Sequence, residues 1–146
     1  LIDTEDICHN DLLILCATVL SHICQRFAND QKPQTALQIK TETHIPIRVM
    51  MDILYRLKEV NLISDNFSPT SDEVTYTPTH DTNNITIGEM IARLESTPAS
   101  DFVLLGFSPK KVWNHDIYNR VGSIRETYLN ELKSINIKEL ISYSEN

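Results

Sequence analysis

The chain of 146 residues has little glycine and none of the glycine-rich motifs that hold phosphates or nucleophiles. It contains 3 glycines, and the GxGxxG, GxSxG and P-loop patterns are absent. Its five histidines are scattered, with no HxH or HxxxH spacing that would supply the ligands of a hydrolytic metal site. We therefore expect no enzymatic activity, no metal and no cofactor.

Long hydrophobic runs and an excess of basic residues are also missing. The longest apolar run, Leu12 to Leu20, is far shorter than the roughly 20 residues that cross a bilayer. The chain has 13 Lys and Arg against 20 Asp and Glu, which gives a net charge of −7. Because neutralisation of phosphates supplies most non-specific affinity for nucleic acid, this balance makes nucleic acid an unlikely partner.

The three cysteines do not form a metal-binding or disulfide pattern. Cys8, Cys16 and Cys24 recur every eight residues, a spacing that turns a helix by about 80° and places them on different faces. Structural zinc sites instead use closely spaced pairs. The cysteines are expected to be buried free thiols in a reducing, cytoplasmic compartment.

Hydrophobic periodicity predicts a mostly α-helical fold with one small β-hairpin. The expected elements are a helix over 6–29, a short helix over 35–40, a tight turn over 41–44, a helix over 46–60, strands over 61–64 and 73–77, and a helix over 85–95. This order is that of a winged helix-turn-helix. We expect a winged-helix domain over 1–100, with the helix-turn-helix at about 35–60 and the wing at about 62–77.

A connector and a C-terminal helical extension are expected over 101–146, including a long helix from Pro109 to about Ile135. The apolar run Phe102–Leu105 is expected to pack onto the domain. Apolar residues in the long helix recur at steps of three and four and form a candidate docking stripe: Trp113, Ile117, Val121, Ile124, Tyr128 and Leu132. Such a stripe is predicted to pack against another surface, by self-association or docking.

The charges of the helix-turn-helix and the wing disfavour DNA binding. Residues 35–60 carry 4 basic and 3 acidic groups, whereas residues 61–108 carry 1 and 7. The second helix begins with mainly apolar residues, and its candidate recognition surface consists of Arg48, Asp52 and Arg56. We therefore expect the winged helix to serve as a packing or docking module. The alternative is a transcription regulator that binds duplex DNA through Arg48 and Arg56.

The run IPIRVMMDILYRLKEVNLIS, a hairpin that ends in YTP, a connector with Asp81, and ITIGEMIARLES together resemble a known domain. They are similar to the C-terminal cytoplasmic domain of YihY/BrkB-family membrane proteins, in the Bacteroidetes-like form, over about residues 8–100. The same order also resembles the IscR-type winged-helix repressors. Those repressors place three cysteines after the wing and polar residues at the start of the second helix, and this chain has neither feature.

The YihY/BrkB resemblance implies a non-catalytic interaction or regulatory domain at the cytoplasmic face of the bacterial inner membrane. Its partners would be its own membrane domain or further copies of itself. The start at Leu1 instead of Met leads to the expectation that membrane helices precede this piece. The family is often labelled ribonuclease BN, a tRNA-processing nuclease, but the residues offer no phosphodiesterase chemistry.

Overall fold

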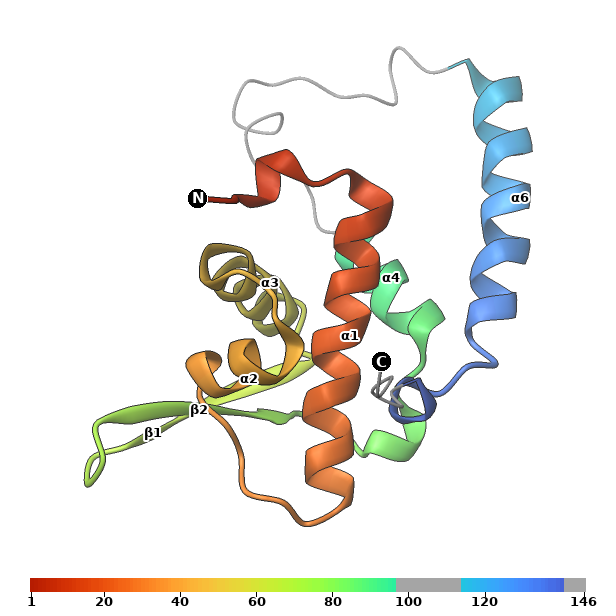
Figure 1. Ribbon diagram of the computed structural model, residues 1–146. Helices are drawn as coiled ribbons and strands as arrows, with labels where there is room; N and C mark the ends of the chain where they lie inside the picture. Colours follow the sequence, from red (N-terminus) through yellow and green to blue (C-terminus); the bar gives the residue numbers. More distant parts are fainter. Residues whose placement is uncertain (97–113, 141–146) are drawn as a thin grey trace, which may run out of the picture.

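The computed structural model describes residues 1–96 and 114–140 (Figure 1). Its elements are η1 (Thr4–Asp6), α1 (His9–Ala28), α2 (Ala36–Thr43), α3 (Ile47–Glu59), β1 (Ile63–Ser68), β2 (Glu73–Pro78), η2 (Thr82–Asn84), α4 (Ile87–Ser96), α6 (His115–Leu132) and η4 (Ile137–Glu139), of which the η elements are short 3-10 helices. The predicted fold class, a mostly helical winged helix-turn-helix with one hairpin and a long C-terminal helix, is confirmed.

The predicted first helix is divided into two elements. A carboxylate at each end stabilises the 3-10 turn η1: Asp3 accepts a hydrogen bond from the backbone of Thr4, and Asp6 accepts one from the backbone of Asp3. The extended backbone of Cys8 then starts α1. This reciprocal capping ends the first turn before a continuous helix can form.

The other boundaries follow local turn chemistry. α2 continues three residues beyond the predicted end and closes at His44, whose φ of 62° gives the left-handed conformation of a helix C-cap. β1 continues to Ser68 instead of ending at residue 64, because the hairpin reverses only at the turn that contains Asp72, with φ 54°. Hydrophobic alternation in the sequence does not detect a strand whose side chains are mostly exposed.

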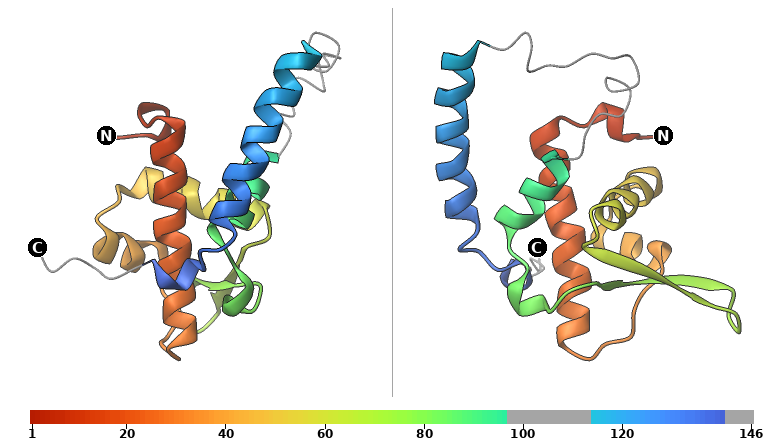
Figure 2. Two further views of the ribbon diagram at one scale, coloured as in Figure 1. Left: turned by 90° about the vertical axis from the view of Figure 1, so that its right-hand side faces the viewer. Right: turned by 180° about the vertical axis from the view of Figure 1, so that it is seen from behind.

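The core is built around α1, with α2, α3 and the hairpin on one side and α4 and α6 on the other (Figures 1 and 2). The largest fully buried side chains come from both sides and include Leu20, Ile39, Met50, Ile53, Leu54, Leu57, Leu62, Ile63, Met90 and Ile137. Each contributes about 1.5–3 kcal/mol of burial free energy. In the part of the chain that the structure describes, α1 is the one helix long and apolar enough for a membrane span, and 39% of that apolar window is buried inside the domain.

Backbone pairing fixes the crossing of α4 and α6. The Ile87 amide donates to the Ile135 carbonyl at 3.1 Å, and the Ile137 amide donates to the Ile85 carbonyl at 2.9 Å. Ile137 is fully buried and returns the end of the chain to the core. The start of α4 is thereby tied to the segment that follows α6.

Two charged residues of α4 connect it to the rest of the domain. Glu95 accepts hydrogen bonds from His9 of α1 at 2.5 Å and from Arg125 of α6 at 2.6 Å. Burial raises the pKa of Glu95, but the hydrogen bonds from His9 and Arg125 outweigh it and the pKa is lowered. Arg93 donates to the carbonyl of Val60, the residue that ends α3, at 3.2 Å.

Two of the three thiols are buried as expected, but Cys8 is exposed. Burial raises the pKa of Cys16 and of Cys24 to about 12. At pH 8 a thiol with a pKa of about 12 is about one part in 10,000 thiolate, the reactive form. We expect iodoacetamide to modify one cysteine per folded chain, Cys8, and all three in guanidinium, as counted by intact mass. Modification of Cys16 or Cys24 at the rate of Cys8 would contradict this burial.

Three predictions lie outside the described residues. They are the position of Trp113, the packing of Phe102–Leu105 and the start of the long helix at Pro109. The division of the chain at residue 100 also stays a prediction, because it falls in the same segment, 97–113.

Candidate nucleic-acid interface

The helix-turn-helix is held by caps that the sequence encodes locally. The Thr35 hydroxyl accepts a hydrogen bond from the Gln38 amide, while the Gln38 side chain accepts one from the Thr35 amide, so α2 begins with a capping box. His44 closes α2, and Pro46 starts α3. Ile45, between them, is buried and packs the turn against the core. α3 is therefore presented at a fixed angle to α2.

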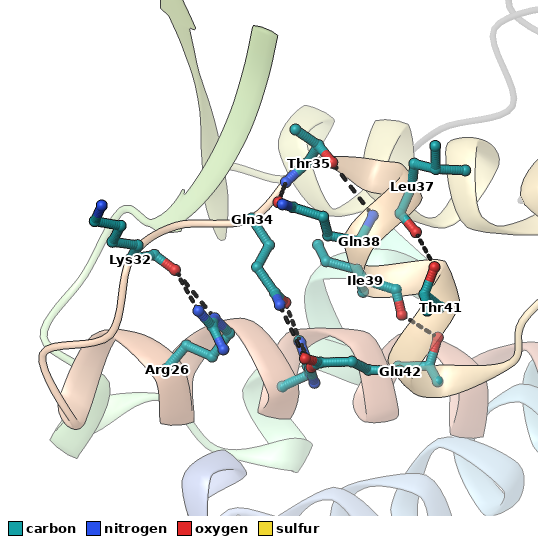
Figure 3. A network of polar contacts seen from close by, with 11 residues as sticks. Arg26, Lys32, Gln34, Thr35, Leu37, Gln38, Ile39, Thr41 and Glu42 are labelled. Carbon is teal, nitrogen blue, oxygen red and sulfur yellow. Dashed lines mark hydrogen bonds and ion pairs between the residues drawn. The ribbon is translucent and has the colours of Figure 1, made fainter.

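A buried polar network joins α2 to α1. His22 of α1 is 3% exposed, and its Nε2 lies 2.6 Å from Oε1 of Gln34 and 3.2 Å from Oε2 of Glu42. The Gln34 amide donates to Glu42 at 3.1 Å, and Arg26 donates twice to the Lys32 carbonyl beside it (Figure 3). Because a buried polar group without a partner is costly, these contacts hold α2 in one position on α1.

The three predicted recognition-helix residues lie on the outer side of α3, but they are not equivalent. Arg56 donates to Asp52 at 2.9 Å, so this pair largely neutralises itself. Arg48, in the first turn of α3, is exposed and makes no hydrogen bond or ion pair with residues 1–96 or 114–140. Its guanidinium is available to an external acceptor.

Sequence reasoning missed a row of exposed apolar residues on α3. Ile47, Met51 and Tyr55 are 37%, 47% and 61% exposed. Of the two adjacent methionines of α3, the structure buries Met50 completely and leaves Met51 exposed. The sequence spacing could have revealed this row. Ile47, Met51 and Tyr55 recur every four residues, beside the apolar residues of α3 that face the core.

The wing is anchored to the helix-turn-helix and is less acidic than its composition indicates. The Tyr76 amide of β2 donates to the Gln34 carbonyl at 3.1 Å, just before α2. Lys58 at the end of α3 donates to Asp65 of β1 at 2.8 Å. This hydrogen bond raises the pKa of Lys58 and lowers that of Asp65, so both stay charged and paired. The C-terminal end of α3 is therefore tied to the wing.

The tip of the wing carries both hydroxyls and carboxylates. Its exposed turn contains Thr70 and Ser71, whose hydroxyls can donate to phosphate oxygens. Asp72 and Glu73 follow them and are also exposed. Phosphate contacts at this end would therefore depend on neutral donors.

The predicted docking stripe follows the side of α6 that turns toward the groove between α1, α4 and α6, and most of it is exposed. Ile117, Val121, Ile124 and Tyr128 are all exposed, while Leu132 is partly buried against the core. The N-terminal half of α6 projects away from α1 and α4 (Figure 2). Tyr128 and Leu132 also line an apolar groove of about 360 Å³ between α1, α4 and α6. An apolar surface therefore extends from this groove along α6.

The described residues contain no cluster of three or more His, Cys, Asp or Glu side chains that could hold a metal ion.

No family model matches the chain, and no curated protein is similar to it in sequence. Solved structures do share its fold. CymR (YrzC), the global cysteine regulator of B. subtilis, is 15% identical with a TM-score of 0.61, over 92% of this chain and 95% of that one. IscR of T. potens is 14% identical with a TM-score of 0.59, over 91% and 90%. The oxidized form of Staphylococcus aureus CymR is 15% identical with a TM-score of 0.57, over 92% and 96%.

These similarities correct three expectations. The structures that match are winged-helix regulators, so the function inferred from the YihY/BrkB resemblance, a non-catalytic interaction domain of a membrane protein, is wrong. The ribonuclease BN description loses its support in the same way. The expectation that nucleic acid is an unlikely partner is also wrong, because it rested on charges summed over the chain and its segments and not on which charged side chains are paired in space. The YihY/BrkB resemblance itself and the location at the inner membrane stay predictions.

Proposed function

We propose that this protein is a transcription regulator that binds duplex DNA through the winged helix and acts by binding, without catalysing a reaction. The observation that carries the proposal is Arg48 in the first turn of α3, which has no partner among residues 1–96 and 114–140, on a helix held against α2 and tied at its C-terminal end to the wing. Residues near the start of the second helix are those that reach base edges in helix-turn-helix proteins. The fold shared with CymR and IscR supports this assignment.

In this proposal α3 enters the major groove and Arg48 donates two hydrogen bonds to O6 and N7 of a guanine, the commonest specific contact of arginine. The hydroxyls of Thr70 and Ser71 and the amides at the start of α2 would contact phosphates on either side. With so few unpaired cations on this face, affinity would come from specific contacts more than from counterion release.

The exposed stripe on α6 supports a homodimer as the DNA-binding form. Helix-turn-helix dimers read two half-sites about one helical turn apart, roughly 34 Å. A second copy is the occupant that we propose for the stripe, because α6 lies on the opposite side of α1 from α3 and the wing (Figure 1). Two copies joined there would leave both recognition helices free.

Arg48→Ala is expected to weaken binding to a selected duplex by about 10- to 100-fold, since a bidentate arginine–guanine pair provides about 1–3 kcal/mol of discrimination. The duplex is first obtained by selection of the full chain on a random pool, and affinity is then measured by fluorescence anisotropy. Lys133→Ala is the matched control, because it removes one exposed positive charge at the end of α6 and is expected to leave affinity unchanged.

Two results would oppose the proposal. A selection that enriches no sequence, with binding weaker than about 100 µM at low salt, would overturn DNA binding as the function. Equal losses in Arg48→Ala and Lys133→Ala would show a general charge effect and remove Arg48 from base recognition.

A further inference from the structure

The exposed apolar row of α3 lies beside Arg48 on the surface proposed to face DNA. Ile47 is the first residue of α3, Arg48 the second, and Met51 lies one turn further along. A rise of 1.5 Å per residue places Met51 about 6 Å beyond Ile47 along the helix axis. Both apolar side chains thus lie in the first two turns, the part of a recognition helix that reaches base edges.

The stability of the domain does not account for this row. The inner side of α3 already buries Val49, Met50, Ile53, Leu54 and Leu57, each at most 1% exposed. Ile47 and Met51 keep 37% and 47% of their surface in solvent. The exposed part of each side chain is therefore free to contact a partner outside the described residues.

The major groove presents one apolar group on its base edges, the 5-methyl group of thymine. We infer that Ile47 and Met51 read thymine methyl groups beside the guanine bound by Arg48, so that each half-site contains thymine next to guanine. The inference rests on the proposed function, and its ligand is duplex DNA. The row lies in the first two turns of α3, beside Arg48, whose guanidinium can donate to guanine, and this position favours duplex DNA as its ligand.

Substitution of deoxyuridine for thymine tests this inference, since it removes the methyl group and keeps every hydrogen-bonding group of the base pair. Each thymine of the selected duplex is replaced in turn, and the affinity of the full chain is measured by anisotropy. We expect a loss of about fourfold at one or two positions in a half-site, the value of burying one methyl group. When both half-sites carry the change, the expected loss is about sixteenfold.

Two alanine variants of α3 test which side chain contacts each thymine methyl group. In Ile47→Ala the deoxyuridine penalty at one of these positions is expected to disappear, and Met51→Ala is expected to remove the penalty at another. Leu37→Ala is the matched control, because Leu37 is an exposed apolar residue on α2 and its loss is expected to leave every penalty in place. Far-UV circular dichroism verifies that all three variants are folded.

The outcomes separate the two proposals. Tight binding to the selected duplex with no penalty at any deoxyuridine position overturns thymine reading and leaves DNA binding intact. The same conclusion follows if the penalties persist in both Ile47→Ala and Met51→Ala. Absence of binding to any duplex, together with capture of an apolar helical peptide by this face, overturns both.

Discussion

The double variant Ile117→Asp, Ile124→Asp is expected to be a folded monomer that binds DNA about 100-fold or more weakly than the wild-type dimer. Both side chains belong to the docking stripe of α6, are exposed and lie outside the buried core. Two carboxylates at the centre of an apolar interface would be desolvated without partners. Loss of the dimer also removes the linkage between two half-site contacts, which is worth about 10²- to 10⁴-fold in avidity.

Sedimentation velocity measures the oligomeric state, and anisotropy on the same samples measures affinity. The control is Ser123→Asp, Asn130→Asp, which adds the same charge to exposed positions of α6 that lie on the opposite face at 100° per residue. We expect this control to remain dimeric. A wild-type chain that sediments as a monomer at micromolar concentration, or a control that dissociates equally, would remove the stripe as the dimer interface.

Gly88→Ala is expected to lower stability by about 1–3 kcal/mol, the range for forcing extra atoms into a packed site. A Cβ at Gly88 would lie 2.6 Å from the Leu129 carbonyl oxygen and 2.7 Å from the Lys133 amide nitrogen. Both are backbone atoms of α6 and its C-cap, and the pairing of Ile87 with Ile135 prevents the two segments from separating freely. α6 must shift as a whole to admit one methyl group.

Thermal unfolding followed by circular dichroism measures this loss. Gly122→Ala, in the middle of α6, is the matched control, because a Cβ there meets nothing within 4 Å. Removal of a helical glycine is expected to stabilise the chain by up to about 1 kcal/mol. The two glycine-to-alanine changes should therefore move the midpoint in opposite directions. Equal shifts would show that α4 and α6 are not in close contact at Gly88.

Much of the fold could be predicted because its signals are local. The pairing of Thr35 with Gln38 and the proline before α3 define helix starts within a few residues. The boundaries that were wrong depend on turns read from φ angles, such as those of His44 and Asp72. Contacts between α4 and α6 could not be predicted, because the two helices are far apart in the sequence and only one residue, Gly88, marks the crossing.

The functional surface was harder to predict because charge was counted along the sequence and not in space. Asp52 and Asp65 made α3 and the wing seem unfavourable for DNA, yet each is paired with a basic residue of α3, Arg56 and Lys58 respectively. Pairing neutralises these two acids together with the two bases, so the net charge of the face is unchanged, and Arg48 is the cation of α3 that has no partner among the described residues. The exposed row at Ile47 and Met51 was not identified, because hydrophobic periodicity does not distinguish a core from a binding surface.

The close contact at Gly88 has a consequence for the spacing of DNA sites. α6 crosses α4 at that glycine, and α4 reaches the end of α3 through the hydrogen bond from Arg93 to the Val60 carbonyl. In a dimer joined along α6, the direction of α6 at this crossing sets how far apart the two copies of α3 are held. In such a dimer, Gly88 would help to set the number of base pairs between the two half-sites. It would do so although it lies far from the proposed DNA-binding surface and has no side chain.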